Sequence, residues 1–464
     1  MEIIRVIEEK ILHVTEKVLE TLEGGIDYNT FTKELKKELD GLGVGIMQEV
    51  IEAMDQQIVK DKKERKDWVI ERKGDYKSIL TPFGEMTYKR TYFKNKETKK
   101  YSYLADENAG ITAHMRIEPT LKSELLEATT KLSYEKATQE LSRYNSELKL
   151  SKQTAANTVR DFKAKDYEIP CDKKEVPTLY IEADEDHLSV RSKRGAQARL
   201  IYVHEGVKEV NGRRMLINPK YFTSIDEKPE DFWFRVCDFI YSQYDVNCIN
   251  DIYILGDGAK WIRSGLEYIP SSTFILDKFH LSKYIIMATA HAPNLKTKIY
   301  KNIKKLDREA VLENLKEALA KADSKPRKKR IQKTITYIKN TWDGIKASIE
   351  NPEIGCSAEG HVSHVLSSRL SSRPMAWSLN GAKKMASMRA VEANKEQVKD
   401  HYLETYKQKD NKVIELTTEV RKQLKDLKTR KKIGKESFSN VPVMEYGVNL
   451  TRVALRGLNN KISI

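Results

Sequence analysis

The chain has 464 residues, with 83 lysines and arginines against 68 aspartates and glutamates, and a formal net charge of +15. This length is more than one ordinary hydrophobic core requires and predicts two or three domains. The basic excess favours a polyanionic partner, nucleic acid being the simplest, because each cation on a phosphate releases condensed counterions.

Nothing in the composition indicates a membrane or secreted protein. No segment approaches the roughly 18 uninterrupted apolar residues of a transmembrane helix, and the first residues resemble an amphipathic helix rather than a signal peptide. The four cysteines form no CxxC pair, as expected for reduced thiols inside a cell. We therefore expect a cytoplasmic protein without a membrane partner.

The N-terminal 60 residues predict two helices. Apolar residues recur at helical spacing over residues 3–18, and a second helix is expected at Phe31–Met54. Residues 63–100 change to alternating aromatic and β-branched residues, interrupted at Gly74 and Pro82, which predicts a small hairpin or meander. In this region aromatic residues alternate with basic ones, namely Tyr88, Arg90, Tyr92 and Lys94. The pattern indicates either a DNA contact or an ordinary amphipathic sheet with a solvated face.

Residues 117–166 are again helical, with a break that resembles a helix-turn-helix. Ser133 and Ser151 are candidate N-caps. If the second helix enters the major groove from Ser151 onward, its exposed side chains would contact base edges; these are Lys152, Gln153, Asn157 and Arg160. Any αα-hairpin has a similar pattern, so this alternative stays open.

Two apolar strands each lead to an aspartate. The segment TLYIEAD predicts a central strand with Asp184 at its C-terminal end, and IYILGD repeats the pattern with Asp257. Gly256 and Gly258 flank the second aspartate and permit a close backbone approach. A single such aspartate is more often a helix N-cap, but two of them with a later Glu359 favour a shared site for Mg²⁺ or Mn²⁺, hard ions that prefer carboxylate oxygen.

Further elements connect these acids. RLIYVHEGVKEV predicts a strand antiparallel to the first, followed by a helix near 230–241 and a strand at 274–277. This element order is that of an RNase H-like sheet. Asp277 and His280 are three residues apart and share one face of the next helix; the alternative is an N-cap aspartate with a surface histidine. A lysine-rich helical stretch, including the basic cluster 325–330, then separates Asp257 from Glu359.

The segment around Glu359 permits two metal chemistries. Cys356, His361 and His364 suggest zinc with Glu359 as a base, but the spacing lacks a partner cysteine pair. On a helix over 358–370, Glu359 would share a face with Val362 and the histidines would point away from it. Three arginines in and after this segment are candidate phosphate contacts or solvated surface residues: Arg369, Arg373 and Arg389.

Several motifs together resemble a known family. Mutator-related insertion-sequence transposases have segments similar to DEDHLSVR, GDGAKWI and LDKFHLSKYI. The ISLre-type (ISLre-two) transposases of Gram-positive bacteria have a segment that SAEGHVSHVLSSRLSSRPMAWS resembles. This resemblance extends over most of the chain. The resemblance implies a DDE transposase with an RNase H-like core and a helical insertion. It implies Asp184, Asp257 and Glu359 as the catalytic, metal-binding triad, with a supporting role for Asp277 and His280.

The neighbouring acids Glu182 and Asp186 leave open which acid of EADED is the principal ligand, and Asp186 is at least a supporting residue. The expected protein is an α/β transposase that binds element ends and target double-stranded DNA as a homo-oligomer. The alternatives are a metal-dependent RNase H-like nuclease without strand transfer and a non-catalytic helix-turn-helix regulator.

The expected regions are helices at 1–60, small β at 61–112, DNA binding at 113–170, core at 171–283, insertion at 284–352, the Glu-bearing helix at 353–395 and a basic helical tail at 396–464.

Overall fold

The computed structural model describes residues 3–63, 65–145, 148–191, 193–373 and 375–409. The chain divides into two compact units, one containing residues 1–118 and the other residues 119–409. Each unit is described by itself. The basic segment 424–437 of the predicted tail lies outside the described residues.

The first unit is a helical pair with a β-hairpin. Its elements are α1 (Ile3–Glu23), α2 (Tyr28–Lys60), β1 (Trp68–Thr81), β2 (Gly84–Asn95), β3 (Tyr101–Ser102) and α3 (Leu104–Asn108). Asp27 caps α2 by accepting hydrogen bonds from the backbone N–H groups of Asn29 and Thr30. β1 and β2 pair antiparallel and close at Thr81 and Gly84. The predicted helices and hairpin are confirmed.

Two of the four hairpin residues considered as DNA contacts bind other residues of the same unit. Tyr88 is fully buried and donates a hydrogen bond to Asp106, and Arg90 forms an ion pair with the same carboxylate. For these two residues the amphipathic-sheet alternative is the right one. Tyr92 and Lys94 are partly exposed.

The second unit begins with three helices: α4 (Pro119–Lys131), α5 (Tyr134–Tyr144) and α6 (Lys152–Asp161). Ser133 accepts a hydrogen bond from the N–H of Lys136, and Ser151 accepts one from the N–H of Thr154. Both predicted N-caps are confirmed. The buried residues Leu125, Ala137 and Ala155 hold the three helices together.

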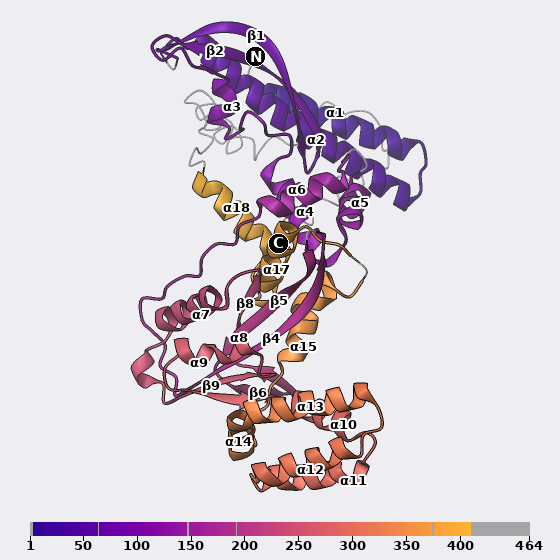
Figure 1. Cartoon of the computed structure of the whole chain (residues 1–464). Helices are drawn as coiled ribbons and strands as arrows, with labels where there is room; N and C mark the ends of the chain where they lie inside the picture. Colours follow the sequence, from indigo (N-terminus) through magenta and orange to yellow (C-terminus); the bar gives the residue numbers. More distant parts are fainter. Residues whose placement is uncertain (1–2, 64, 146–147, 192, 374, 410–464) are drawn as a thin grey trace. The chain divides into compact units, whose positions relative to one another are not determined.

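A mixed five-stranded sheet forms the centre of this unit (Figure 1). Its strands are β4 (Thr178–Val190), β5 (Lys193–His204), β8 (Lys220–Ile225), β9 (Asp251–Gly256) and β10 (Ser272–Leu276), in the spatial order β10-β9-β4-β5-β8. β4, β5 and β8 pair antiparallel, whereas β9 and β10 run parallel to β4. Along the chain, a small hairpin of β6 (Val207–Val210) and β7 (Arg213–Leu216) lies between β5 and β8.

Helices cover both faces of the sheet. On one face, α7 (Pro229–Gln243) buries Trp233 and Val236 against Ile181 and Ile254. The short helices α8 (Lys260–Arg263) and α9 (Gly265–Tyr268) follow β9. The opposite face packs against a helical segment formed by α15 (Ala358–Val362), a π-helical turn (Ser363–Ser367) and α16 (Ser368–Leu370), followed by α17 (Leu379–Ala393).

The segment predicted as a helical insertion, residues 284–352, is helical in the structure and follows β10. It comprises α10 (Lys278–Thr289), α11 (Pro293–Lys304), α12 (Arg308–Ala320), α13 (Lys325–Asn340) and α14 (Trp342–Glu350). Figure 1 shows these helices gathered at one end of the sheet. α18 (Val398–Lys409) packs against α4. Within the described residues, no helix has both the length and the apolar character needed to cross a bilayer.

Candidate functional site

Asp184 and Asp257 meet where β9 ends beside β4. Strand β9 pairs with β4 only as far as Glu182 opposite Leu255. Asp184 lies just beyond this last pair, and Asp257 directly follows the end of β9. Contrary to the sequence prediction, Asp184 is not at the end of its strand, because pairing with β5 extends β4 to Val190.

Two glycines permit the close approach at this point. A Cβ on Gly256 would stand 2.7 Å from the carbonyl oxygen of Ala183, a distance that real Cβ atoms do not adopt. Gly258 has a φ of +87°, which disfavours other residues, and a Cβ there would meet Thr341 at 2.7 Å. Any other residue at 256 would push the Asp257 segment away from β4, so the close approach that Gly256 permits is to the backbone of β4.

The two carboxylates influence each other electrostatically. Asp184 is only 8% exposed. Burial raises the pKa of Asp184 to about 6, and the negative charge of Asp257 adds to the increase, although the N–H of Glu185 and the charge of His280 oppose it. A pKa this far above the ordinary value indicates that a negative charge at Asp184 lacks sufficient compensation from the surrounding protein.

Asp277 and His280 lie within electrostatic range of this pair. Asp277 caps α10 by accepting from the N–H of Phe279, and its other oxygen lies 2.7 Å from Nδ1 of His280. That hydrogen bond raises the pKa of His280 against the opposing effect of burial, and the charges of Asp257 and Asp184 raise it further. The N-cap alternative is therefore correct for Asp277, while His280 is half-buried and hydrogen-bonded to Asp277 rather than being a plain surface histidine.

Other acids of the EADED segment have protein partners. Asp186 accepts a hydrogen bond from Ser371. Glu185 accepts one from the indole N–H of Trp261. Burial raises the pKa of Glu185, and Asp257 contributes to the increase. The carboxylate of Asp184 accepts a hydrogen bond from the backbone N–H of Glu185, and among the described contacts no side chain donates to it.

Glu182 forms the centre of a buried polar network that sequence analysis did not identify. Its side chain is 1% exposed and lies 3.1 Å from Nε2 of His204. The backbone N–H and the hydroxyl of Ser357 also donate to its carboxylate. Burial raises the pKa of Glu182, but these hydrogen bonds outweigh burial and the pKa is lowered. Unlike Asp184, Glu182 is a charge that the fold compensates fully.

This network fixes the start of the helix that carries Glu359. Ser357 directly precedes α15, and its hydroxyl also lies 2.8 Å from that of Tyr202. The side chain of Glu359 itself is exposed, whereas Val362 on the same short helix is buried. The expected shared face of Glu359 and Val362 is therefore wrong. The reason is that Ala358, Val362 and Val365 supply the helix face that packs on the sheet.

The zinc alternative does not assemble. His361 turns toward the sheet, where its Nδ1 lies 3.0 Å from the hydroxyl of Tyr221, while His364 is exposed. Burial lowers the pKa of His361 and raises that of the Cys356 thiol well above its usual value, which disfavours a thiolate ligand. Within the described ranges, no group of three or more His, Cys, Asp or Glu side chains is placed to hold a metal ion.

The predicted triad of Asp184, Asp257 and Glu359 is likewise not a three-residue metal-binding group in the described ranges. Asp184 and Asp257 are brought together, and their carboxylate oxygens, with the poorly compensated charge of Asp184, fit the preference of Mg²⁺ or Mn²⁺. Glu359 lies on the helix that packs against β4 but does not join them in a three-residue group.

The predicted DNA contacts have different environments. On α6, the side chains of Lys152, Gln153, Asn157 and Arg160 are exposed. Gln153 and Arg160 both donate to the amide oxygen of Asn157, which gives this face a fixed arrangement.

The three downstream arginines differ from one another. Arg369 is 6% exposed, donates to the carbonyl oxygen of Thr129 and lies over the rings of Tyr134 and Trp377, so it is a core residue rather than a phosphate contact. Arg389 binds the carbonyl oxygens of His364 and Val365 together with Glu392. Arg373 is exposed.

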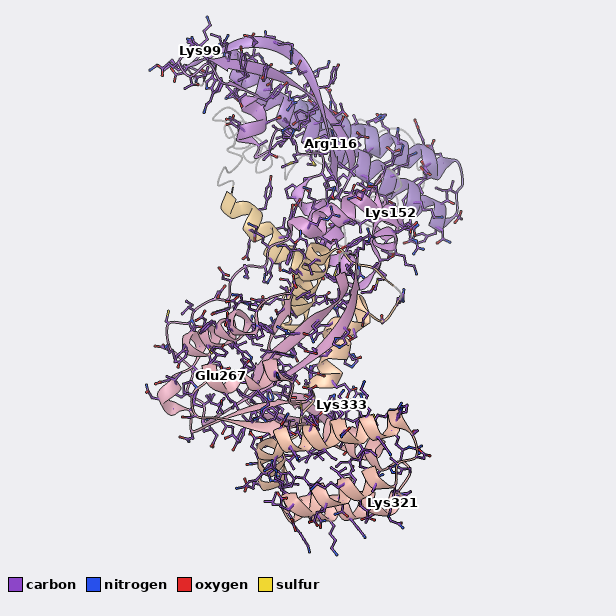
Figure 2. All side chains as sticks on the ribbon, viewed as in Figure 1. Lys99, Arg116, Lys152, Glu267, Lys321 and Lys333 are labelled. Atoms are coloured by element: carbon purple, nitrogen blue, oxygen red, sulfur yellow. The ribbon has the colours of Figure 1, made fainter. Side chains whose placement is uncertain are left out.

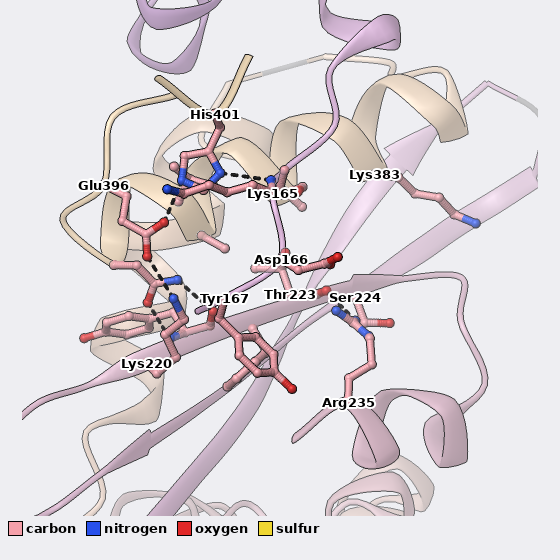
Figure 3. Close-up of a pocket in the computed structure, with 18 of the residues that line it drawn as sticks. Lys165, Asp166, Tyr167, Lys220, Thr223, Ser224, Arg235, Lys383, Glu396 and His401 are labelled. Carbon is pink, nitrogen blue, oxygen red and sulfur yellow. Dashed lines mark hydrogen bonds and ion pairs between the residues drawn. The ribbon is translucent and has the colours of Figure 1, made fainter. Parts of the chain in front are cut away.

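A cavity of about 690 Å³ lies elsewhere in this unit, along the edge strand β8 (Figure 3). Asn394 pairs with the backbone N–H and carbonyl of Tyr221 as a neighbouring strand would, and Arg235 donates to the carbonyl oxygen of Thr223. Glu396 accepts from Lys220 at 2.8 Å and lies 2.6 Å from Nε2 of His401. The hydrogen bond from His401 and the charge of Lys220 lower the pKa of Glu396 to about 2 despite partial burial.

The fold and the paired acids define a mixed α/β protein with a carboxylate site where β9 ends beside the central strand β4. A family model described as an uncharacterised protein family, UPF0236, matches residues 21–409. The chain belongs to the UPF0236 family.

Relatives from one bacterium match nearly the whole chain. UPF0236 protein TTE0610/TTE0881/TTE1053/TTE2432 of Caldanaerobacter subterraneus subsp. tengcongensis is 38% identical over 449 residues, covering 95% of this chain and 94% of the relative. A second UPF0236 protein of that organism, whose name joins eleven locus designations from TTE0033 to TTE2212, is 39% identical over 430 residues, covering 92% and 90%. A UPF0236 protein in the vanSb 3′ region of Streptococcus gallolyticus is 23% identical over 393 residues, covering 78% and 84%.

Proposed function

We propose that this protein is a DDE-type DNA transposase that binds the ends of its element, hydrolyses a phosphodiester to expose a 3′-OH and joins that end to target DNA. The observation that carries the proposal is the pairing of Asp184 with Asp257 where β9 ends beside the central strand β4. Their charges oppose each other, and the pKa of Asp184 is raised to about 6. Perturbed carboxylates of this kind are concentrated at functional sites.

The order of the strands supports the proposal. Three antiparallel strands followed by two parallel ones, with the first strand central, is the arrangement expected for an RNase H-like core. In such a core the acids gather at the end of the parallel strands, which is where Asp257 follows β9. The exposed, N-capped helix α6 supports the proposed helix-turn-helix, whose basic and amide side chains would contact the DNA.

The names of the relatives give independent support. One joins four locus designations and another joins eleven, all within one organism. Several gene copies in one genome are what an element that moves by transposition would leave behind. A regulator or a housekeeping nuclease gives no comparable reason for so many copies.

In this proposal Asp184 and Asp257 would hold Mg²⁺ or Mn²⁺, and Glu359 would complete the site. When bound, the metal would stabilise charge on the attacking and leaving oxygens of the phosphodiester. Asp277 would keep His280 oriented beside the carboxylates through their 2.7 Å hydrogen bond. The network of Glu182, His204 and Ser357 would hold the start of the helix carrying Glu359 against β4.

The test is a reaction of the purified full chain with duplex DNA carrying the element ends, in Mg²⁺, in Mn²⁺ and in EDTA. We expect metal-dependent nicking at the ends together with joined products. Cleavage without joined products would identify a nuclease instead, and specific binding without cleavage would favour a regulator. A matched reaction with Asp257→Asn separates the activity of this chain from contaminating nucleases.

A further inference from the structure

The helical insertion makes direct contact with the candidate site. The hydroxyl of Tyr337 on α13 donates a 2.7 Å hydrogen bond to the backbone carbonyl oxygen of Asp257. Tyr337 stacks on Tyr284 of α10 with ring centroids 4.0 Å apart and 17° between planes. Arg263 on α8 forms a two-contact ion pair with Asp343 at the start of α14, at 2.9 and 2.7 Å. These contacts fix one end of α13 beside Asp257.

The insertion accounts for most of the net positive charge of the chain. Residues 278–350 contain 18 lysines and arginines and 7 acids, a net charge of +11 within a chain whose total is +15. Helix α13 alone has seven basic residues and no acid. Like charges at this density repel one another, and the few acids of the segment offset only part of that repulsion, which points to an external polyanion as the compensating partner.

A single row on α13 leads to the site. Arg330, Lys333 and Tyr337 follow one another at intervals of three and four residues, so they share a helix face. Arg330 and Lys333 are exposed, and neither makes an ion pair with an acid in the described part of the chain. The ammonium of Lys333 lies 5.8 Å from the ring centre of Tyr284, so the same tyrosine pair that reaches Asp257 also supports Lys333.

The chemistry of this row favours nucleic acid over a membrane surface. The buried side of α13 is apolar, with Ile331 and Ile338 in the core, while its exposed side has no large hydrophobic residue. A helix that lies in a lipid interface needs an exposed apolar face as well as basic residues. Guanidinium and ammonium groups without such a face suit the phosphates of a DNA backbone.

We propose that Arg330 and Lys333 bind DNA backbone phosphates next to the scissile one and guide that strand to Asp257, with Tyr337 fixing the distance between the row and the carboxylate. This inference rests on the proposed function. It assigns DNA contacts to the insertion, in addition to those expected of α6. Figure 2 shows Lys333 at the end of the insertion nearer the sheet, and Lys321 at its far end.

The test compares two charge-matched double variants by fluorescence anisotropy with a labelled DNA duplex over a range of salt concentrations. Arg330→Ala with Lys333→Ala removes the row. The far-end variant, Lys316→Ala with Lys321→Ala, removes the same charge from exposed positions on and just after α12, where Lys321 already binds Glu317 at 2.6 Å. Thermal denaturation checks that both variants are folded.

We expect the first variant to bind more weakly, with a log–log salt slope shallower by roughly 1.8, because each lost phosphate contact removes about 0.9. The far-end variant should keep nearly the wild-type slope, and exchanging Arg330→Lys and Lys333→Arg should restore binding. If the two alanine variants have equal slopes while wild-type protein binds and cuts DNA, the inference alone is wrong. If the wild-type chain binds no duplex at all, both the inference and the proposed function are wrong.

Discussion

Two acids of the second unit, Asp184 and Glu396, are both at least partly buried, but their pKa values are shifted in opposite directions. Glu396 accepts from Lys220 and His401, and its pKa is lowered to about 2. Asp184 has Asp257 as a neighbour, and its pKa is raised to about 6. The fold stabilises the charge of Glu396 and penalises the charge of Asp184.

The difference separates a structural carboxylate from one available for chemistry. Glu396 connects β8 with the segment before α18, and its bonding capacity is used within the protein. Glu182 belongs to the same group, since His204 and Ser357 occupy its oxygens. Asp184 retains a charge that a cation from outside would neutralise. The cavity along β8 is therefore less informative than the pair of Asp184 and Asp257, because its polar groups largely bind one another.

The largest stability effect is expected for Glu182→Ala. Removing this buried acid leaves His204 and Ser357 without their partner, which should cost about 3–5 kcal/mol of unfolding free energy. Chemical denaturation at neutral pH measures the loss. Glu396→Ala is the control, and its smaller effect follows from its 34% exposed side chain. Equal losses for the two variants would show that the Glu182 network does not hold α15 on the sheet.

A smaller effect of opposite sign is expected for Asp184→Asn in EDTA. The raised pKa means that the folded protein binds the proton of Asp184 more tightly than the unfolded chain, whose ordinary value is 3.8. The wild-type protein therefore loses stability as the pH rises from about 4 to about 6, and the loss persists above that range. Asparagine avoids the penalty, so the variant should be more stable at pH 7.5 by about 1–3 kcal/mol, at about 1.4 kcal/mol per pKa unit. The gain should disappear at pH 4. A variant that is less stable than wild type at pH 7.5 contradicts this account of Asp184.

The smallest effect is expected for Glu396→Gln. Because the pKa of Glu396 is lowered from 4.5, its charge contributes stability that is present above pH 4.5 and is lost as the pH falls toward 2. Partial exposure limits the contribution to about 1 kcal/mol or less. Unfolding experiments at pH 7 and pH 3 should show a destabilised variant at pH 7 and a reduced difference at pH 3. If the difference in unfolding free energy between wild type and Glu396→Gln grows at low pH, the charge of Glu396 does not stabilise the fold.

Local patterns predicted much of this fold. Apolar runs located β4 and β9, and serines at candidate N-cap positions located the starts of α5 and α6. Asp184 and Asp257 were identified because each follows an apolar run, and the glycines beside Asp257 indicated a close approach. These signals are contained within a few neighbouring residues, so they require no knowledge of tertiary contacts.

The features that sequence analysis missed depend on distant partners. Glu182 meets His204 only through the β4–β5 register and Ser357 only through the placement of α15. Tyr337 reaches Asp257 across 80 positions. Arg369 has the sequence context of a surface arginine, but two aromatic rings and a carbonyl oxygen stabilise its guanidinium in the core. Periodicity and local motifs contain none of this information.

The most direct test of the central claim is the rate of Mg²⁺-dependent cleavage of element-end DNA by Asp184→Asn and Asp257→Asn, with DNA affinity measured in parallel. Both variants should lose cleavage by about 1000-fold or more, the scale for a directly participating carboxylate, while binding stays close to wild type. Glu359→Gln, measured in the same series, tests whether the exposed glutamate of α15 completes the site. Wild-type cleavage rates in either aspartate variant would contradict the assignment of Asp184 and Asp257 as the catalytic pair.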